Sequence, residues 1–195
     1  AVGVPGGALV ADGIQMLGPG GNLELRDNTV QGSGRVGVLA SGEVVGIILN
    51  NKVSSNGRAG IWLEARAGKA GTIKVEGNTV RDNGFVGIGM TGESVGIILN
   101  NLVSGTAPGE PEREGEVAMG DGIGVFGGSL CEVRDNDANG NARAAILVDD
   151  AHPATVVVGN NATGNGYGVV VQGQLTQATG SEPDGSRDEN YEADN

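Results

Sequence analysis

Three residues in the C-terminal half have the side-chain types of an acid–base centre. Asp149, Asp150 and His152 directly follow the apolar residues 146–148. A histidine titrates near neutral pH and can serve as a general base, and a neighbouring carboxylate can orient its ring. The string that holds them, DDAHP, is equally typical of a turn before Pro153, and we favour the turn.

A second set of residues combines guanidinium groups with aromatic rings. Its members are Arg35, Arg58, Trp62, Phe85, Arg143 and Tyr167. All of them except Trp62, which shares the face of Arg58 by strand parity, recur at one position of the sequence repeat. Arginine binds carboxylates through two parallel hydrogen bonds, and aromatic faces stack on flat or apolar surfaces such as sugar rings. We therefore expect an external face suited to an acidic polysaccharide. The plainer alternative is that the arginine stems cover the surface and pair with the glutamates of the acidic insertion.

Residues 105–119 form an acidic segment that interrupts the repeat. Its charged members are Glu110, Glu112, Arg113, Glu114 and Glu116. Insertions in regular repeat proteins often form the functional face, and these carboxylates could hold Ca²⁺, although a solvated loop without function is the alternative. No zinc spacing, phosphate-binding loop or Ser-His-Asp pattern occurs, so we predict no other cofactor and no metal site.

Composition excludes several classes of protein. The chain has 195 residues, a formal net charge of −12 and 38 glycines, with only 3% aromatic residues. An acidic chain without clustered Lys and Arg is not expected to bind nucleic acid. No apolar run reaches the 18 residues of a membrane span, so no membrane insertion is predicted. Cys131 stands alone, which rules out a disulfide framework and favours a buried side chain.

The elements that must position these residues come from an internal repeat. Residues 27–54 and 77–104 are identical at 17 of 28 positions, with an offset of 50. A weaker half-repeat is marked by an asparagine at each step, with an aliphatic residue three positions before it. These asparagines are Asn28, Asn51, Asn78, Asn101, Asn136 and Asn161.

The repeat predicts an all-β, right-handed parallel β-helix (a solenoid) of about six to seven coils. Its period-2 runs are too short for helices, and N-G and D-N-G turns separate them. Coils of about two dozen residues would stack about 4.8 Å apart, which places the six asparagines in an internal ladder. We expect the solenoid over residues 1–174, with the insertion at 105–119, and an acidic tail, linker or cap at 175–195.

Strings such as Asn51–Leu63 and Asn78–Met90, of the form N-x-V-x-x-N-G-x-x-G-I-x-L, resemble the pectin-lyase-like superfamily of parallel β-helix repeat proteins. The resemblance covers about residues 10–173. It implies the fold, but it leaves the activity open, because that superfamily includes polysaccharide lyases, glycoside hydrolases, epimerases, adhesins and proteins without known activity. Lyases of this fold use Arg or Lys as the base, which makes Arg143 a candidate.

We expect a non-catalytic scaffold or glycan-binding, adhesin-type module, belonging to a larger bacterial surface or secreted protein. One alternative is a polysaccharide lyase or epimerase that acts on an acidic glycan. Another is a structural fibre unit that stacks end to end. The duplicated GIILNN segments also predict an outward apolar patch suited to self-association, formed by Ile47, Leu49, Ile97 and Leu99.

Overall fold

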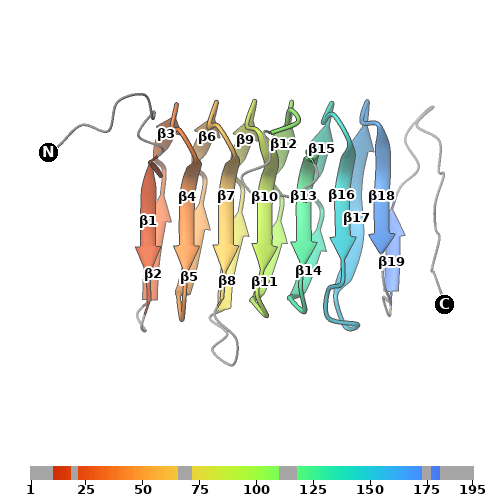
Figure 1. The fold of residues 1–195 in the computed structure, drawn as a ribbon. Coiled ribbons are helices and arrows are strands. Elements are labelled where there is room, and N and C mark those ends of the chain that lie inside the picture. The colour runs from red at the N-terminus through yellow and green to blue at the C-terminus, as the bar shows by residue number, and fades with distance from the viewer. Residues whose placement is uncertain (1–10, 19–21, 66–71, 110–117, 173–176, 181–195) are drawn as a thin grey trace, which may run out of the picture.

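The computed structural model describes residues 11–18, 22–65, 72–109, 118–172 and 177–180. These residues form one stack of coils in which all described strand pairs are parallel (Figure 1). A complete coil contributes one strand to each of three sheets, which we name the first, second and third sheets. The described chain makes six such coils and begins a seventh with β18 and β19. The prediction of an all-β parallel solenoid is therefore confirmed.

The first sheet faces the viewer in Figure 1. Its members are β1 (Ile14–Leu17), β4 (Val36–Ser41), β7 (Ala59–Glu64), β10 (Phe85–Thr91), β13 (Gly120–Phe126), β16 (Ala144–Asp149) and β18 (Tyr167–Gln172). The second sheet contains β2 (Asn22–Arg26), β5 (Val45–Leu49), β8 (Thr72–Glu76), β11 (Val95–Leu99), β14 (Leu130–Arg134), β17 (Val156–Thr163) and β19 (Gln177–Gly180). The third sheet contains β3 (Thr29–Gln31), β6 (Lys52–Ser54), β9 (Thr79–Arg81), β12 (Leu102–Ser104) and β15 (Asp137–Asn139), and the end of β17 completes it.

Aliphatic side chains stacked from coil to coil fill the interior. In the first sheet Val38, Ile61, Ile88, Ile123 and Ile146 pair in register, and none of them has exposed surface. Burying one such side chain stabilises the fold by about 1.5–3 kcal/mol. Their β-branched shape also suits a pleated sheet, so the Val and Ile content of the repeat favours both the strands and the core.

Glycines before these inward residues are required by close packing. A Cβ built on Gly60 would lie 2.5 Å from Val80 Cγ1 and 2.6 Å from the carbonyl oxygen of Gly87. Gly37 and Gly122 would meet similar clashes inside the coil. Two consecutive positions point inward here, and the first is occupied by glycine or, before Ile146, by the buried Ala145. This explains why Gly-Val or Gly-Ile recurs in the sequence.

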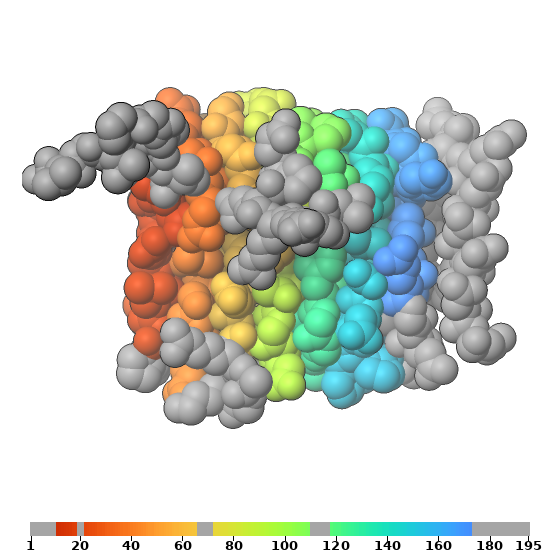
Figure 2. Space-filling model, viewed as in Figure 1, coloured from red at the N-terminus to blue at the C-terminus, as the bar shows by residue number. Residues whose placement is uncertain are grey.

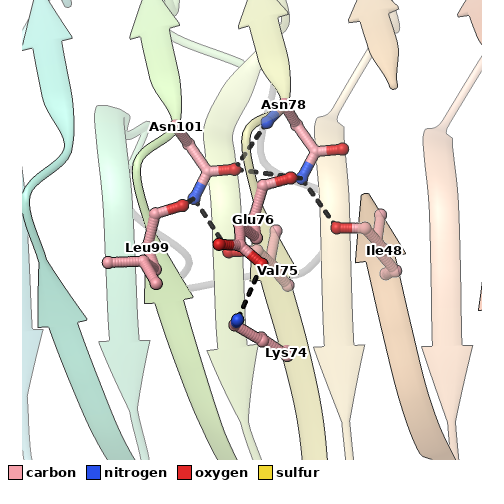
Figure 3. Close-up of polar contacts among 7 residues, drawn as sticks. All are labelled: Ile48, Lys74, Val75, Glu76, Asn78, Leu99 and Asn101. Carbon is pink, nitrogen blue, oxygen red and sulfur yellow. Dashed lines mark hydrogen bonds and ion pairs between the residues drawn. The ribbon is translucent and has the colours of Figure 1, made fainter. Parts of the chain in front are cut away.

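A ladder of buried asparagines joins the coils where the second sheet meets the third. The side-chain Oδ1 of Asn78 accepts hydrogen bonds from the backbone N–H and Nδ2 of Asn51, at 2.8 and 3.1 Å. Its Nδ2 donates to Asn101 Oδ1 at 2.9 Å, and to the carbonyl oxygens of Ile48 and Glu76 (Figure 3). Asn78 therefore satisfies backbone groups of its own coil and of the preceding coil, as well as the side chain of the next rung.

The last rung of this ladder is Asn160, and the prediction of Asn161 was wrong by one residue. Asn160 Oδ1 accepts from the backbone N–H and Nδ2 of Asn136, both at 2.9 Å, and only 1% of Asn160 is exposed. Asn161 points outward and donates to Asp137 Oδ1. A strand reverses its side-chain direction at each residue, so a shift of one position exchanges inside for outside.

A second ladder, which the sequence reasoning missed, runs between the third and first sheets. Asn56 Nδ2 donates to Asn83 Oδ1 at 2.8 Å, and Asn141 Nδ2 donates to Asn165 Oδ1 at 2.9 Å. Thr106 fills this position in the fourth coil, where its backbone N–H donates to Asn141 Oδ1 at 3.1 Å. The first part of the 105–119 segment therefore belongs to the solenoid. Gly109 donates from its backbone N–H to the Met119 carbonyl at the base of the insertion.

The charged residues of the insertion lie outside the described residues, and so do residues 1–10 and 181–195. They include Glu110, Glu112, Arg113, Glu114 and Glu116. Within the segment expected as a tail, Gln177–Gly180 form β19, which pairs with β17. No helix among the described residues is long and apolar enough to cross a membrane.

The adjacent residues Asn160 and Asn161 provide a matched test of the ladder. Asn160→Ala should lower the free energy of unfolding by about 2–4 kcal/mol, because it leaves buried backbone groups without partners. Asn161→Ala should change it by less than about 0.5 kcal/mol, because that side chain is exposed. Denaturant unfolding followed by circular dichroism checks both values, and equal effects would contradict this assignment of the rung.

Cys131 is buried, as predicted, and burial raises the pKa of its thiol to about 12. Because the thiolate is the reactive form, the native protein should not react with iodoacetamide over hours at pH 8. The same protein in guanidinium chloride should react with one equivalent. Mass spectrometry of the two samples measures this difference, and rapid labelling of the native protein would show that this part of the core opens.

Candidate functional site

An open groove of about 350 Å³ lies on the outer face of the first sheet. Its walls come from successive coils, so residues far apart in the sequence meet there. They are Arg35, Val36, Arg58, Trp62, Glu64, Phe85, Thr91, Met119, Phe126 and Asp149. The structure thus brings together four of the predicted face residues, namely Arg35, Arg58, Trp62 and Phe85. Figure 2 views the molecule from the side of this sheet.

Two aromatic rings lie flat along the floor of the groove because the sheet has glycines beneath them. A Cβ on Gly89 would lie 2.3 Å from the Trp62 ring, and one on Gly124 would lie 2.3 Å from the Phe126 ring. The two rings stack on each other with centroids 6.0 Å apart and an interplanar angle of 28°. Glycines at these two outward positions therefore create an extended aromatic surface.

Phe85 supports an arginine and does not itself form a contact surface. The Arg58 guanidinium carbon lies 4.1 Å from the centroid of the Phe85 ring, a cation–π contact, and Phe85 is only 3% exposed. Phe85 also has a φ of 60°, which is rare for a bulky residue and costs about 1–3 kcal/mol. Arg58 is thereby held at the groove wall with its guanidinium over a ring.

Arg35 and Arg143 each pair with an aspartate one coil earlier in the chain. Arg35 Nη2 donates to Asp12 Oδ2 at 2.5 Å, and Arg143 contacts both carboxylate oxygens of Asp121, at 2.9 and 2.5 Å. Each aspartate also accepts a hydrogen bond from a backbone amide through its Oδ1 atom. The donor to Asp12 is the Val36 N–H, and the donor to Asp121 is the Ala144 N–H. These pairs arise from the two matching Asp-Gly-Ile strings at 12–14 and 121–123.

The charge states of these pairs are fixed by their surroundings. Burial on its own raises the pKa of Asp12, but hydrogen bonds from Arg35, Gln15 and the Val36 amide outweigh it, and the pKa is held below its usual value. The hydrogen bond with Asp121 raises the pKa of Arg143 further above its already high value. Arg143 is thus a permanent cation tied to a carboxylate, and it is poorly suited to act as a base.

Arg143 and Tyr167 line a separate depression of about 200 Å³, with Leu147 and Val170 on its floor. Tyr167 pairs in register with Ala144, one position beyond Arg143. The predicted face of six residues is therefore divided between two depressions on the same sheet.

The predicted acid–base residues do not converge. Asp149 ends β16 and lines the groove, whereas Asp150 has a φ of 49° in the turn that follows. His152 is exposed, and its Nδ1 accepts a hydrogen bond from the Ala154 amide at 3.1 Å. This contact within the turn supports the interpretation of DDAHP as turn chemistry. No group of three His, Cys, Asp or Glu side chains that could hold a metal occurs in the described part of the chain.

Sequence reasoning missed Phe126, Thr91 and Glu64 as groove residues. All three occupy one outward column, in which Glu64 pairs with Thr91 and Phe126 pairs with Asp149. Outward parity along the GIGVF string, together with Gly124 two residues earlier, was the signal that could have identified Phe126.

The family model that matches the chain agrees with this architecture. Residues 12–181 match the family model described as "Right handed beta helix region", and the chain belongs to this family. Among solved structures, the chain is similar to that of pectate lyase Pel9A, at 12% identity and a TM-score of 0.41. The match covers 77% of this chain and 51% of that chain, so the chain spans about half the length of that structure. The search of curated proteins finds no match.

Arg143→Ala should reduce stability. The substitution leaves Asp121, whose side chain has no exposed surface, without its charge partner, and we expect a loss of about 2–4 kcal/mol. Arg134→Ala is the control, because Arg134 and its partner Glu132 are both substantially exposed and the pair contributes below about 1 kcal/mol. Thermal unfolding of both variants measures the difference, and equal stabilities would contradict a structural role for the Arg143–Asp121 pair.

Proposed function

We propose that this chain is a non-catalytic β-helix module that binds an acidic polysaccharide in the groove of the first sheet, at a cell surface or outside the cell. The observation that carries the proposal is the flat Trp62–Phe126 surface beside the guanidinium groups of Arg35 and Arg58. Sugar rings offer apolar faces to aromatic rings, and the carboxylates of an acidic glycan suit arginine forks.

The groove has a direction of charge. Arg35 and Arg58 line it just before β4 and β7 begin, while Glu64 and Asp149 line it where β7 and β16 end. A glycan carboxylate would therefore bind at the arginine end. The opposite end would accept hydroxyl groups, which can donate hydrogen bonds to a carboxylate.

The spacing of carboxylates favours binding over hydrolysis. Glu64 and Asp149 occupy the same outward column but are separated by the coils of β10 and β13, which is three coil steps. Three steps of about 4.8 Å give about 14 Å. Carboxylate pairs in glycosidases lie about 5–9.5 Å apart, so these two residues do not form one.

Trp62 is the only tryptophan, so its fluorescence reports on this groove alone. Titration with polygalacturonate should change its emission, and calorimetry should give a matching affinity. Phe126→Ala should weaken binding at least about tenfold, because base or sugar stacking on a ring contributes about 1–3 kcal/mol. Arg58→Ala should weaken binding of polygalacturonate but not of a neutral polysaccharide.

Arg81→Ala is the matched control for the arginine, because Arg81 is exposed on the third sheet. Its affinity should equal that of the wild type. The same mixtures should show no growth of the ultraviolet absorbance of unsaturated uronides, which would instead indicate a lyase. Failure to bind any of a set of acidic polysaccharides, or unchanged binding by Phe126→Ala, would contradict the proposal.

A further inference from the structure

The outer face of the second sheet, which is separate from the groove on the first sheet, alternates between ion-paired and apolar rows from one coil to the next. β2, β8 and β14 each present two opposite charges two residues apart, and β5, β11 and β17 each present two aliphatic residues. The charged rows are Glu24–Arg26, Lys74–Glu76 and Glu132–Arg134; the apolar rows are Ile47–Leu49, Ile97–Leu99 and Val156–Val158.

The strand register places these residues in two straight columns. One column reads Glu24, Ile47, Lys74, Ile97, Glu132, Val156, and the other reads Arg26, Leu49, Glu76, Leu99, Arg134, Val158. Every charged position in one column is matched by the opposite charge at the same level of the other column. Figure 3 shows one of these rows, with Lys74 paired to Glu76.

These outward residues remain accessible in the single chain. The side chains of Glu24 and Arg26 are 51% and 54% exposed, and Ile47, Leu49, Ile97 and Leu99 are each partly exposed. Partly exposed aliphatic rows next to charged rows are unusual on a surface that meets only water.

We propose that this face binds the same face of a second copy of the chain, with the two solenoids side by side and pointing in the same direction. A two-fold axis parallel to the solenoid axis keeps each coil at its level and reverses the strand direction. The first column of one copy then faces the second column of the other. Glu24 meets Arg26, Lys74 meets Glu76, and Ile97 meets Leu99, so all six rows are complementary.

Reversing the order of the coils gives a poorer match. Such an antiparallel pair has its two-fold axis parallel to the strands. If the axis passes at the level of β8, Lys74 meets Lys74 of the second copy and Glu24 meets Glu132, and both contacts join like charges. If the axis passes at the level of β11, Lys74 meets Glu132 and the charges agree, but the Glu24–Arg26 row then lies beyond the last complete coil of the partner. Only the arrangement with parallel solenoids uses every row.

The size of the face sets the expected affinity. Six strands about 4.8 Å apart and about five residues long cover roughly 500 Å² per copy. This is below the roughly 800 Å² per partner of a standard stable interface. We therefore expect a dimer that forms at concentrations of about 10–100 µM.

Charge exchange tests both the contact and its direction, by analytical ultracentrifugation of the full chain. Lys74→Glu and Glu76→Lys should each weaken self-association at least about tenfold, because each puts two like charges in one row. Mixing the two variants should restore dimers, since an all-glutamate row then faces an all-lysine row. The double variant Lys74→Glu/Glu76→Lys should dimerise as the wild type does.

Ile97→Glu should abolish dimers, while Leu102→Glu is the matched control, because Leu102 is an exposed aliphatic residue on the third sheet. Circular dichroism of each variant confirms that it is folded. A wild-type chain that is monomeric at 200 µM would overturn the proposal. Dimers whose charge variants are not rescued by mixing would overturn the parallel arrangement. Neither result depends on glycan binding, which is located on the first sheet.

Discussion

One hydrogen-bonding requirement organises this molecule: at the corners between the second and third sheets, a buried side-chain amide must satisfy backbone groups of its own coil and of the preceding coil. The residue before each of these asparagines has a positive φ, from 51° to 67°, and is Asp, Asn or Gly. A left-handed residue turns the chain sharply, and the following asparagine compensates for the backbone groups that the turn removes from the sheets. The left-handed residue thus forms the corner, and the asparagine supplies the hydrogen bonds that the corner backbone would otherwise lack.

The ladder fixes the register of the whole stack, and the register in turn determines the surfaces. Because each coil lies directly over the last, outward residues form straight columns along the solenoid. The groove exists because Trp62 and Phe126 fall in neighbouring columns over Gly89 and Gly124. The alternating rows of the second sheet exist for the same reason. A surface residue in such a protein therefore has its neighbours mainly on the coils above and below it.

The sequence was sufficient to predict the fold, because the period, the recurrent Gly-Val and Gly-Ile pairs and the recurrent asparagines all indicate one structure. The last rung was missed for a physical reason. Residues 159–161 read Gly-Asn-Asn, and either asparagine can follow a left-handed residue. The run of valines at 156–158 removes the usual contrast between inward and outward positions. Spacing alone could not decide between them.

The candidate site was predictable only in part. Arg35 and Arg58 share a face because their spacing of 23 residues follows the repeat, and the parity of the strand placed Trp62 on the same face. The role of Phe85 could not be foreseen, because its positive φ turns its side chain away from the direction that parity gives. The pairing of Arg143 with Asp121 had a signal in the sequence, since these residues lie 22 positions apart and Arg35 and Asp12 lie 23 positions apart, each aspartate opening an Asp-Gly-Ile string. The contact between the two side chains becomes visible only once the strands are in register.

The duplicated unit of 50 residues has a consequence for how this molecule could change in length. It comprises two coils, one of 23 and one of 27 residues between asparagine rungs, and the extra residues fall between β7 and β8, outside the strands. Copying the unit once more would lengthen the stack by about 10 Å. Each ladder asparagine would still hydrogen-bond to the asparagine of the next coil, and charged and apolar rows would still alternate on the second sheet. Evolution by whole-unit duplication would therefore extend the first and second sheets without disturbing either end of the stack.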